Sequence, residues 1–401
     1  MLTGRSSSAV VAAKRTPGQR VRAALWAVRV PVGVYLASRL LVLLAAAAGG
    51  FIATTSGRPV LTGPWPVLTG TGRATVDALL RWDSAWYVEV ATRGYSADPN
   101  GPAGAPNAFF PLFPALVRWC AALTGLPPGP AGLVVAFGTG LAATVLVWLL
   151  ARQVAGTQTA DRTAALFAFF PGAFVFSMVY SEGLLVALAA ATLLALGDRR
   201  WLLAGVLAAA TTATRPNGAA IGVACAWAAW VALRERREWR ALVAPALAPA
   251  GILAFFAFLA VRTGDPLAWF TAQREAWSEK IDLTAQVRRI GLVIDVPTNP
   301  EGSLNTLLPV LGGVVIVVAL VLLLRWRPSG PVVAYTLTAS AIVLVSASIG
   351  ARPRMLLAAF PLVMALAHSV RGSAFAALLA GSAGGLATLM VITASTLAAT
   401  P

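Results

Sequence analysis

The chain has 401 residues, of which 58% are hydrophobic and only 11% charged, and its mean hydropathy is +0.77. One aqueous core cannot bury so large an apolar fraction, which excludes an ordinary water-soluble domain. The formal net charge is +16. Because the basic residues lie mostly in short connections between apolar runs and form no groove-sized cluster with aromatic residues, we expect no nucleic-acid partner.

The first 26 residues form a basic tail without an acidic residue. The apolar stretch that follows is too long for the core of a signal peptide and has no clear small-residue cleavage site. We therefore expect residues 1–26 to be a retained cytoplasmic tail and residues 27–401 to form a single integral membrane domain. The basic residues of the tail include Arg5, Lys14, Arg15, Arg20 and Arg22.

Apolar runs of about 20 residues, the length that a helix needs to cross a bilayer, recur along the chain. Backbone polar groups in lipid must be satisfied within each segment, so these runs are expected to be helices. The sequence predicts an all-α polytopic membrane protein with about eleven transmembrane helices. The expected spans are residues 27–52, 131–151, 161–176, 178–196, 201–214, 217–233, 242–262, 305–325, 331–350, 355–369 and 373–398.

The positive-inside rule gives the expected topology. With the tail in the cytoplasm, the basic connections lie on the same side, provided that residues 108–123 do not cross the membrane. Pro111 and Pro114 break up that segment, which we expect to be interfacial or re-entrant. Two long loops, 53–130 and 263–304, then face outward. The basic connections contain Arg152 and Arg162, Asp198–Arg200, Arg234–Arg240, Arg325–Arg327, and Arg371.

The first outward loop contains Asp83 within an expected helix over residues 75–92. On that helix a carboxylate falls within an apolar stripe about 100° wide, where partial loss of hydration makes it a stronger proton acceptor. This is the tuning that a general base needs. Alternatively, Asp83 is a structural carboxylate paired with Arg81 or Arg93. The stripe comprises Val76, Leu79, Leu80, Asp83, Tyr87 and Val90.

Further candidates follow along the chain, each with an ordinary structural alternative. Phe109 and Phe110 lie where the chain returns to the membrane interface, and an aromatic belt would use the same residues. Tyr180 and Glu182 lie at the outer end of an expected span, where Glu182 could instead cap a helix.

Arginines on the expected outer side have no topological reason to be there. They occur in two tight breaks between apolar helices, Arg215-Pro216-Asn217 and Arg352-Pro353-Arg354. Guanidinium groups at this level could hold a phosphate through bidentate contacts, and the head group of a lipid donor is the obvious ligand. Snorkelling toward ordinary lipid phosphates is the alternative.

The remaining polar residues predict little chemistry. The loop 263–304 is rich in Trp, Gln, Arg and acids, which suits sugar recognition or a solvated cap equally, and only Asp265 in it is a candidate site residue. The chain has two cysteines, Cys120 and Cys225, and one histidine, His368, without clustered carboxylates. We therefore expect neither a metal nor a cofactor.

Several motifs in this order resemble the PIG-V-like mannosyltransferases, relatives of GPI mannosyltransferase II within the GT-C class of membrane glycosyltransferases. The resemblance covers residues from about 30 to 370. The motifs are RWDSAWYVEVATRGY, NAFFPLFPALVR, FPGAFVFSMVYSEGLLVAL, TRPNG and, more loosely, PRMLLAAFPL.

The resemblance implies a GT-C-type fold in a cell membrane, with interfacial helices and the catalytic Asp83 in the first outward loop. By analogy, Asp83 deprotonates an acceptor hydroxyl that displaces polyprenyl phosphate from a mannose donor with inversion. The acceptor would be a glycan or glycolipid on the non-cytoplasmic face, with membrane lipids around the protein. Substrate contacts are expected from Arg81, Trp82, Tyr87, Tyr95, Phe109, Phe110, Tyr180, Glu182, Arg215, Asn217, Arg352 and Arg354.

Two other functions use the same residues. A transporter or flippase of a lipid-linked saccharide would bind the same phosphate, but it needs a polar path through spans that contain almost no ionisable residue. A non-catalytic scaffold in an envelope-glycan complex would not depend on Asp83.

Overall fold

The computed structural model describes residues 28–55, 74–294 and 300–396. Within these ranges the regular structure is helical, apart from one isolated β-bridge between Ile281 and Ser346. The expected cytoplasmic tail, residues 1–26, and part of the first expected outward loop, residues 56–73, lie outside the described residues.

Six helices or runs of helices in the described part of the chain are long and apolar enough to cross a membrane. The protein is therefore an all-helical, multi-pass membrane protein. These elements are α2 (Arg29–Thr55), α6 (Pro128–Ala155), η3 (Pro216–Ala219) with α10 (Ala220–Arg236), the run of η4 (Trp239–Leu242), α11 (Val243–Leu247) and α12 (Ala250–Thr263), α15 (Pro300–Trp326) and α19 (Gly372–Ser395).

The expectation of about eleven spans needs correction, because several expected spans are short or broken. A seventh span is obtained only if η2 and α8, which meet at a bend of 105°, are counted as one. The expected span 161–176 divides at Pro171, and the expected span 355–369 divides at Pro361, since proline cannot continue a helical hydrogen-bond ladder. The shorter elements are α7 (Thr157–Ala168), η2 (Pro171–Ser177), α8 (Glu182–Gly197), α9 (Trp201–Thr212), α16 (Gly330–Leu344), α17 (Pro353–Leu356), η6 (Leu357–Ala359) and α18 (Pro361–Ser369).

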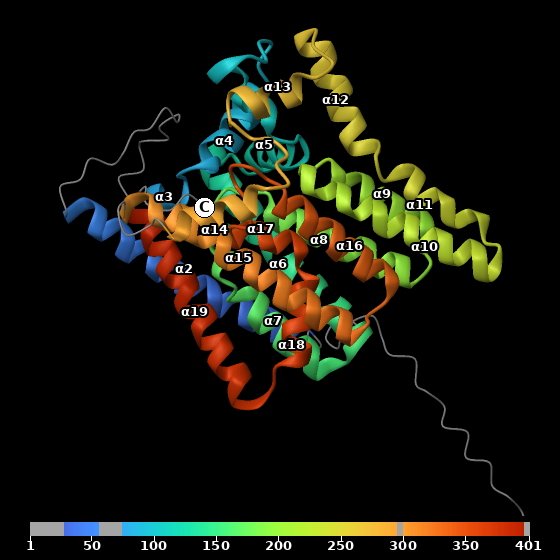
Figure 1. The fold of residues 1–401 in the computed structure, drawn as a ribbon. Helices are drawn as coiled ribbons and strands as arrows, with labels where there is room; N and C mark the ends of the chain where they lie inside the picture. Colours follow the sequence, from blue (N-terminus) through green and yellow to red (C-terminus); the bar gives the residue numbers. More distant parts are fainter. Residues whose placement is uncertain (1–27, 56–73, 295–299, 397–401) are drawn as a thin grey trace, which may run out of the picture.

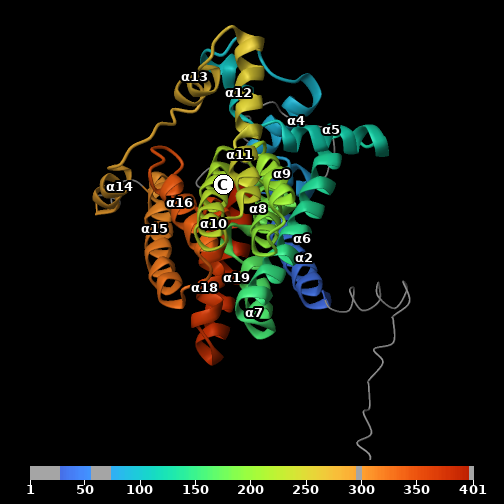
Figure 2. The ribbon, with the colours of Figure 1, turned by 90° about the vertical axis from the view of Figure 1, so that its right-hand side faces the viewer.

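Short helices gather at one end of the bundle, where α4, α5 and α13 lie at the same end as α12 (Figures 1 and 2). Figure 2 shows α5 lying across this end while α6 runs down the bundle, as expected for a segment that does not span. Phe113 and Val117 on α5 are buried, and Trp119 and Leu123 are exposed. The short helices are α3 (Ala74–Leu79), α4 (Asp83–Arg93), η1 (Gly101–Ala108), α5 (Leu112–Thr124), α13 (Ala268–Glu275) and α14 (Ala285–Ile294).

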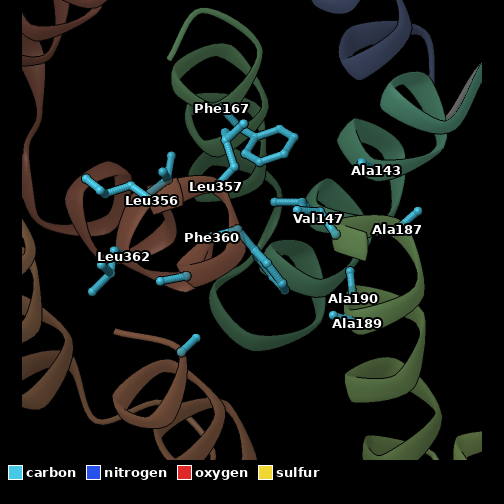
Figure 3. Packing of buried hydrophobic residues seen from close by; sticks show 14 of the residues in the cluster. Ala143, Val147, Phe167, Ala187, Ala189, Ala190, Leu356, Leu357, Phe360 and Leu362 are labelled. Carbon is cyan, nitrogen blue, oxygen red and sulfur yellow. The ribbon is translucent and has the colours of Figure 1, made fainter. Parts of the chain in front are cut away.

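Small residues let the helices of the bundle approach closely, as is usual in membrane proteins. A Cβ atom at Gly183 of α8 would lie 2.8 Å from the Gly140 backbone nitrogen of α6. The core between α6, α7, α8 and the α17–α18 region is filled by alanines with a few large side chains (Figure 3). Leu357 and Phe360 belong to this core, so the segment after Arg354 is fixed by packing.

One buried charge ties the bend after α7 to α2. Arg39 is 3% exposed, and its guanidinium donates to the carbonyl oxygens of Ala168 (3.1 Å) and Ala173 (2.7 Å) and to Ser177 Oγ (3.1 Å). A buried cation is tolerated when hydrogen bonds replace its hydration. Arg39 therefore binds the end of α7 and η2, which lead to Tyr180, to the first span.

Two glycines on α6 test this close packing. A Cβ at Gly140 would lie 2.6 Å from the Tyr35 hydroxyl and 2.8 Å from Phe176 Cβ, whereas a Cβ at Gly138 meets nothing within 4 Å. We expect Gly140→Ala to lower the free energy of unfolding by about 1–3 kcal/mol through overpacking. Gly138→Ala should not lower it. Equal melting temperatures of the two variants in the same detergent would contradict this packing.

Candidate active site

A cavity of about 550 Å³ lies among the short helices and the adjoining ends of the bundle. Four separate parts of the chain supply its polar wall: α4, the break before α10, α13 with the segment after it, and the segment from the end of α16 to α17. Its polar and charged lining residues include Asp83, Tyr87, Arg215, Asn217, Gln273, Glu279, Lys280, Arg352 and Arg354.

Asp83 reaches this cavity because the expected helix 75–92 is broken. The break lies between α3 and α4. Trp82 in this break has φ 61° and ψ −134°, a backbone conformation that residues other than glycine rarely adopt. Contacts with α19 hold the break: Trp82 Nε1 donates to the Thr393 carbonyl at 3.3 Å, and Arg81 Nη1 donates to the Ala394 carbonyl. Asp83 is thus the first residue of α4, where a carboxylate also suits the helix dipole.

Arg354 is the ion-pair partner of Asp83. Its Nη1 lies 2.5 Å from Asp83 Oδ2, and the two side chains are only 7% and 17% exposed. The alternative pairings with Arg81 and Arg93 are wrong, since Arg81 bonds to α19 and Arg93 pairs with Glu89 at 3.0 Å. Among the described residues only Oδ2 of Asp83 accepts a hydrogen bond, so Oδ1 can accept a proton from a ligand in the cavity.

A second ion pair lies directly behind the first. Arg215 Nη1 lies 2.8 Å from Glu182 Oε1, and Arg354 Nη1 lies 3.6 Å from the same oxygen. Glu182 is the first residue of α8 and does not cap it. Its carboxylate, 3% exposed, therefore serves as the shared counter-charge of two arginines.

Aromatic hydroxyl groups connect the two ion pairs. The Tyr180 hydroxyl accepts a hydrogen bond from the Asp83 backbone nitrogen at 3.2 Å, and its ring lies 5.2 Å from the Arg354 guanidinium carbon. The Tyr87 hydroxyl lies 2.6 Å from Ser181 Oγ, and Arg215 Nη1 donates to that Oγ at 3.3 Å. The charged groups are thus held in a continuous polar network.

Burial and the neighbouring carboxylates set the protonation states. Burial alone would lower the pKa of Arg354, but Asp83, Tyr180 and Glu182 together outweigh burial and raise that pKa above its ordinary value. Burial also lowers the pKa of Arg215, but Glu182, with smaller contributions from Tyr87 and Asp83, raises it above its ordinary value. Burial raises the pKa of Tyr87 to about 12, so its hydroxyl stays protonated at neutral pH. Arg352 lines the same cavity.

The other residues expected at the site fall into two groups. Trp82, Phe109, Phe110, Asn217 and Arg352 line the cavity. The others do not line the cavity. Tyr180 and Glu182 lie behind residues that line it, and Arg81 bonds to α19. The Tyr95 hydroxyl donates to the Phe109 carbonyl at 2.9 Å, and Asp265 accepts hydrogen bonds from Leu267 N (2.8 Å) and Thr271 Oγ1 (3.0 Å).

Sequence reasoning missed the contribution of the loop 263–304. Residues of α13 and of the segment after it line the cavity, and the spacing of Trp269, Gln273 and Trp277 by four residues could have indicated a common face. Ser181 was also missed, although it lies between two candidates. In the described ranges no three or more His, Cys, Asp or Glu residues are grouped so that they could hold a metal ion. The missed lining residues of this loop are Trp269, Phe270, Gln273, Trp277, Glu279, Lys280 and Ile281.

The family of the chain follows from a match over residues 108–348, more than half of its length. This match is to the model of glycosyltransferase family 87, and the chain belongs to that family. The chain is thus a multi-pass membrane protein of a glycosyltransferase family. The motifs of the chain resemble those of PIG-V-like mannosyltransferases, whereas the family that matches is family 87. Both are families of membrane glycosyltransferases. No curated protein matches the chain.

Solved structures share the fold at low sequence identity. ArnT from Cupriavidus metallidurans, bound to undecaprenyl phosphate, is 14% identical with a TM-score of 0.50, and the match covers 87% of this chain and 62% of ArnT. The chain thus spans less than two thirds of ArnT. The oligosaccharyltransferase of Archaeoglobus fulgidus, in complex with Zn and sulfate, is 15% identical with a TM-score of 0.44, and the match covers 89% and 53% of the two chains. The likeness to ArnT supports the expected GT-C-type fold.

The buried carboxylate behind the cavity provides a test of the charge network. We expect Glu182→Gln to lower the free energy of unfolding by about 3 kcal/mol, because it removes the shared counter-charge of two buried guanidinium groups. Glu89→Gln is the matched control: it removes a pair whose arginine is 78% exposed, and it should cost less than about 0.5 kcal/mol. Denaturant titration of both variants measures the difference, and similar losses would mean that Glu182 is not a buried counter-charge.

Proposed function

We propose that the protein transfers mannose or a similar sugar from a polyprenyl-phosphate donor to a lipid-linked or cell-envelope glycan acceptor, with inversion and with Asp83 as general base. The observation that supports this most is the Asp83–Arg354 ion pair on the wall of a cavity that Arg215 and Arg352 also line. Membership of glycosyltransferase family 87 supports sugar transfer, and the undecaprenyl phosphate bound to ArnT supports a polyprenyl-phosphate donor.

The proposed step breaks one bond and forms another at the anomeric carbon. The acceptor hydroxyl oxygen attacks that carbon from the side opposite the phosphate, and its proton passes to Asp83 Oδ1. The bond between the anomeric carbon and the phosphate oxygen breaks, and polyprenyl phosphate leaves with the bonding electron pair. Arg354 on Oδ2 fixes the orientation of the carboxylate, so that Oδ1 points to the acceptor.

The arginines would stabilise the leaving phosphate. Guanidinium groups bind phosphate oxygens through paired hydrogen bonds, and such contacts are strongest where water is excluded. Arg354 contacts the base and lines the cavity, so it can bridge Asp83 and the phosphate; Arg215 and Arg352 lie on the same wall. The cavity volume falls within the range of small-ligand sites, and its aromatic wall suits the apolar faces of a sugar or the first isoprene units of the donor.

The charge distribution supports a non-cytoplasmic position for the cavity. The connection between α18 and α19, which contains Arg371, lies at the end of the bundle opposite to α4, α5 and α13 (Figure 2). The positive-inside rule favours the cytoplasm for that connection, which would direct the cavity to the non-cytoplasmic face. Lipid-linked sugars are suitable donors there.

Replacement of the proposed base tests the reaction. We expect Asp83→Asn to reduce transfer of labelled mannose from polyprenyl-phosphate-mannose by at least about 100-fold, because it removes the proton acceptor. Asp98→Asn, which changes an exposed acid of the same outward loop, should transfer at the wild-type rate. Melting temperatures confirm that both variants are folded. Transfer by Asp83→Asn at the wild-type rate would exclude Asp83 as base and favour a scaffold or transporter.

Replacement of an arginine tests donor binding separately. Arg352 lines the cavity, whereas Arg354 and Arg215 are the arginines that pair with Asp83 and Glu182. We expect Arg352→Gln to raise the KM for the polyprenyl-phosphate donor about tenfold, the loss of one charged hydrogen bond, and to change kcat less. Arg262→Gln, at the end of α12, should leave both constants unchanged. An unchanged donor KM in Arg352→Gln would remove Arg352 from the phosphate site.

A further inference from the structure

The segment after α13 pairs with the turn that precedes the arginines. The backbone nitrogen of Asp282 donates to the Val345 carbonyl at 2.8 Å, and that of Ala347 donates to the Lys280 carbonyl at 3.0 Å. The isolated β-bridge between Ile281 and Ser346 lies at the same place. A part of the second outward loop is thus joined to residues 345–350.

Glu279 provides the strongest part of this junction. Its carboxylate accepts hydrogen bonds from Ser346 Oγ (2.8 Å), the Ala347 nitrogen (2.8 Å), Ser348 Oγ (2.6 Å) and the Ile349 nitrogen (3.2 Å). Hydrogen bonds to a charged acceptor are about twice as strong as neutral ones. The Glu279 carboxylate therefore accepts hydrogen bonds from both backbone and side-chain donors of the turn 346–349.

Arg289 of α14 binds the carbonyl groups of the same turn. Its Nη2 donates to the carbonyl oxygens of Ser346 (3.0 Å) and Ala347 (2.8 Å), and the residue is 7% exposed. At the end of the turn, Gly350 has φ 64°, and a Cβ there would lie 2.4 Å from Arg289 Nη1. Glycine is required both for this backbone conformation and for the close approach of the guanidinium.

The turn leads directly to the charged wall of the cavity. Gly350 is followed by Ala351, Arg352 and α17, and α17 contains Arg354. Glu279 itself lines the cavity. The core residues after Arg354 fix one side of this short segment, and the turn 346–349 fixes the other. Backbone pairing alone would be enough to anchor a loop. Here the Glu279 carboxylate and the Arg289 guanidinium also bind the turn 346–349, which precedes Arg352 and Arg354.

We propose that Glu279 is a positioning residue of the transfer reaction, which holds the turn 346–349 and thereby keeps Arg354 directed at Asp83 and the donor phosphate. This rests on the function proposed above. Without the Glu279 contacts the turn moves, Arg354 loses its register with Asp83, and the reaction slows although the base is intact. A displacement of about 1 Å in such a group can reduce the rate by 10²-fold.

The experiment compares Glu279→Gln with Glu275→Gln in nanodiscs. Glu275 is an acid of the same segment that accepts from the Gly101 nitrogen and does not contact the turn. We expect Glu279→Gln to lower kcat by about 10- to 100-fold with a smaller change in the donor KM. It should also speed hydrogen exchange of the amides over residues 345–350. Glu275→Gln should change neither.

A double variant shows whether Glu279 acts through Arg354. If it does, Glu279→Gln added to Arg354→Gln lowers kcat no further, because the group that it positions is already absent. Gly350→Ala, which displaces Arg289 from the other side of the turn, should reproduce the kcat loss and the faster exchange. It provides the same test if Glu279→Gln does not fold.

Each result separates this inference from the proposed function. Fully additive losses, or wild-type exchange over 345–350 in Glu279→Gln, would overturn the positioning role of Glu279 even if the protein transfers mannose. Absence of transfer by the wild-type protein would overturn the proposed function, and the exchange measurement would still show whether Glu279 holds the turn.

Discussion

The buried ion pair between Asp83 and Arg354 is the interaction on which the site depends. Removing both charges from water is costly, and attraction between them offsets that cost only with good geometry and further hydrogen bonds. The chain provides these through Tyr180, whose hydroxyl binds the Asp83 backbone and whose ring lies beside Arg354, and through Glu182 behind them. The Asp83–Arg354 pair thus joins α4 to α17, and Tyr180 and Glu182 connect both elements to the η2–α8 bend.

The helix breaks of the fold serve this same arrangement. Trp82 adopts its unfavourable conformation because α19 binds the residues of the break, and the result is that Asp83 begins a helix beside the cavity. The 105° bend between η2 and α8 similarly places Tyr180 and Glu182 next to the charges. Strained or broken backbone of this kind persists where the surrounding structure over-determines it, and it is common at functional sites.

Sequence reasoning predicted the elements that depend on local pattern. Apolar length predicted the membrane helices, and the prolines of the segment 108–123 predicted an interfacial or re-entrant helix; α5 in this segment lies across one end of the bundle. Asp83 was a candidate because it falls within an apolar stripe, and Arg215 and Arg354 because the positive-inside rule gives no reason for arginines on the expected outer side; the structure brings the three together.

Features set by tertiary contacts could not be predicted in this way. The partner of Asp83 is 271 positions away, and a helical pattern over 75–92 gives no sign of the break at Trp82. The number of spans was too high because hydropathy does not show where Pro171 or Pro361 divides an apolar run. The loop 263–304 had no evident role because its polar residues acquire one only by lying against the turn 346–349.

The charge balance of the site connects its stability with the proposed chemistry. Arg215, Arg352 and Arg354 line the cavity together with Asp83, and their guanidinium groups would attract a donor phosphodiester, which has one negative charge. As the sugar leaves, the phosphate becomes a monoester with close to two negative charges at neutral pH. The arginines would therefore attract the leaving group more strongly in the transition state than in the bound donor, and this differential stabilisation is what accelerates a reaction. An arginine-rich wall around one base is thus better suited to bond cleavage than to binding alone.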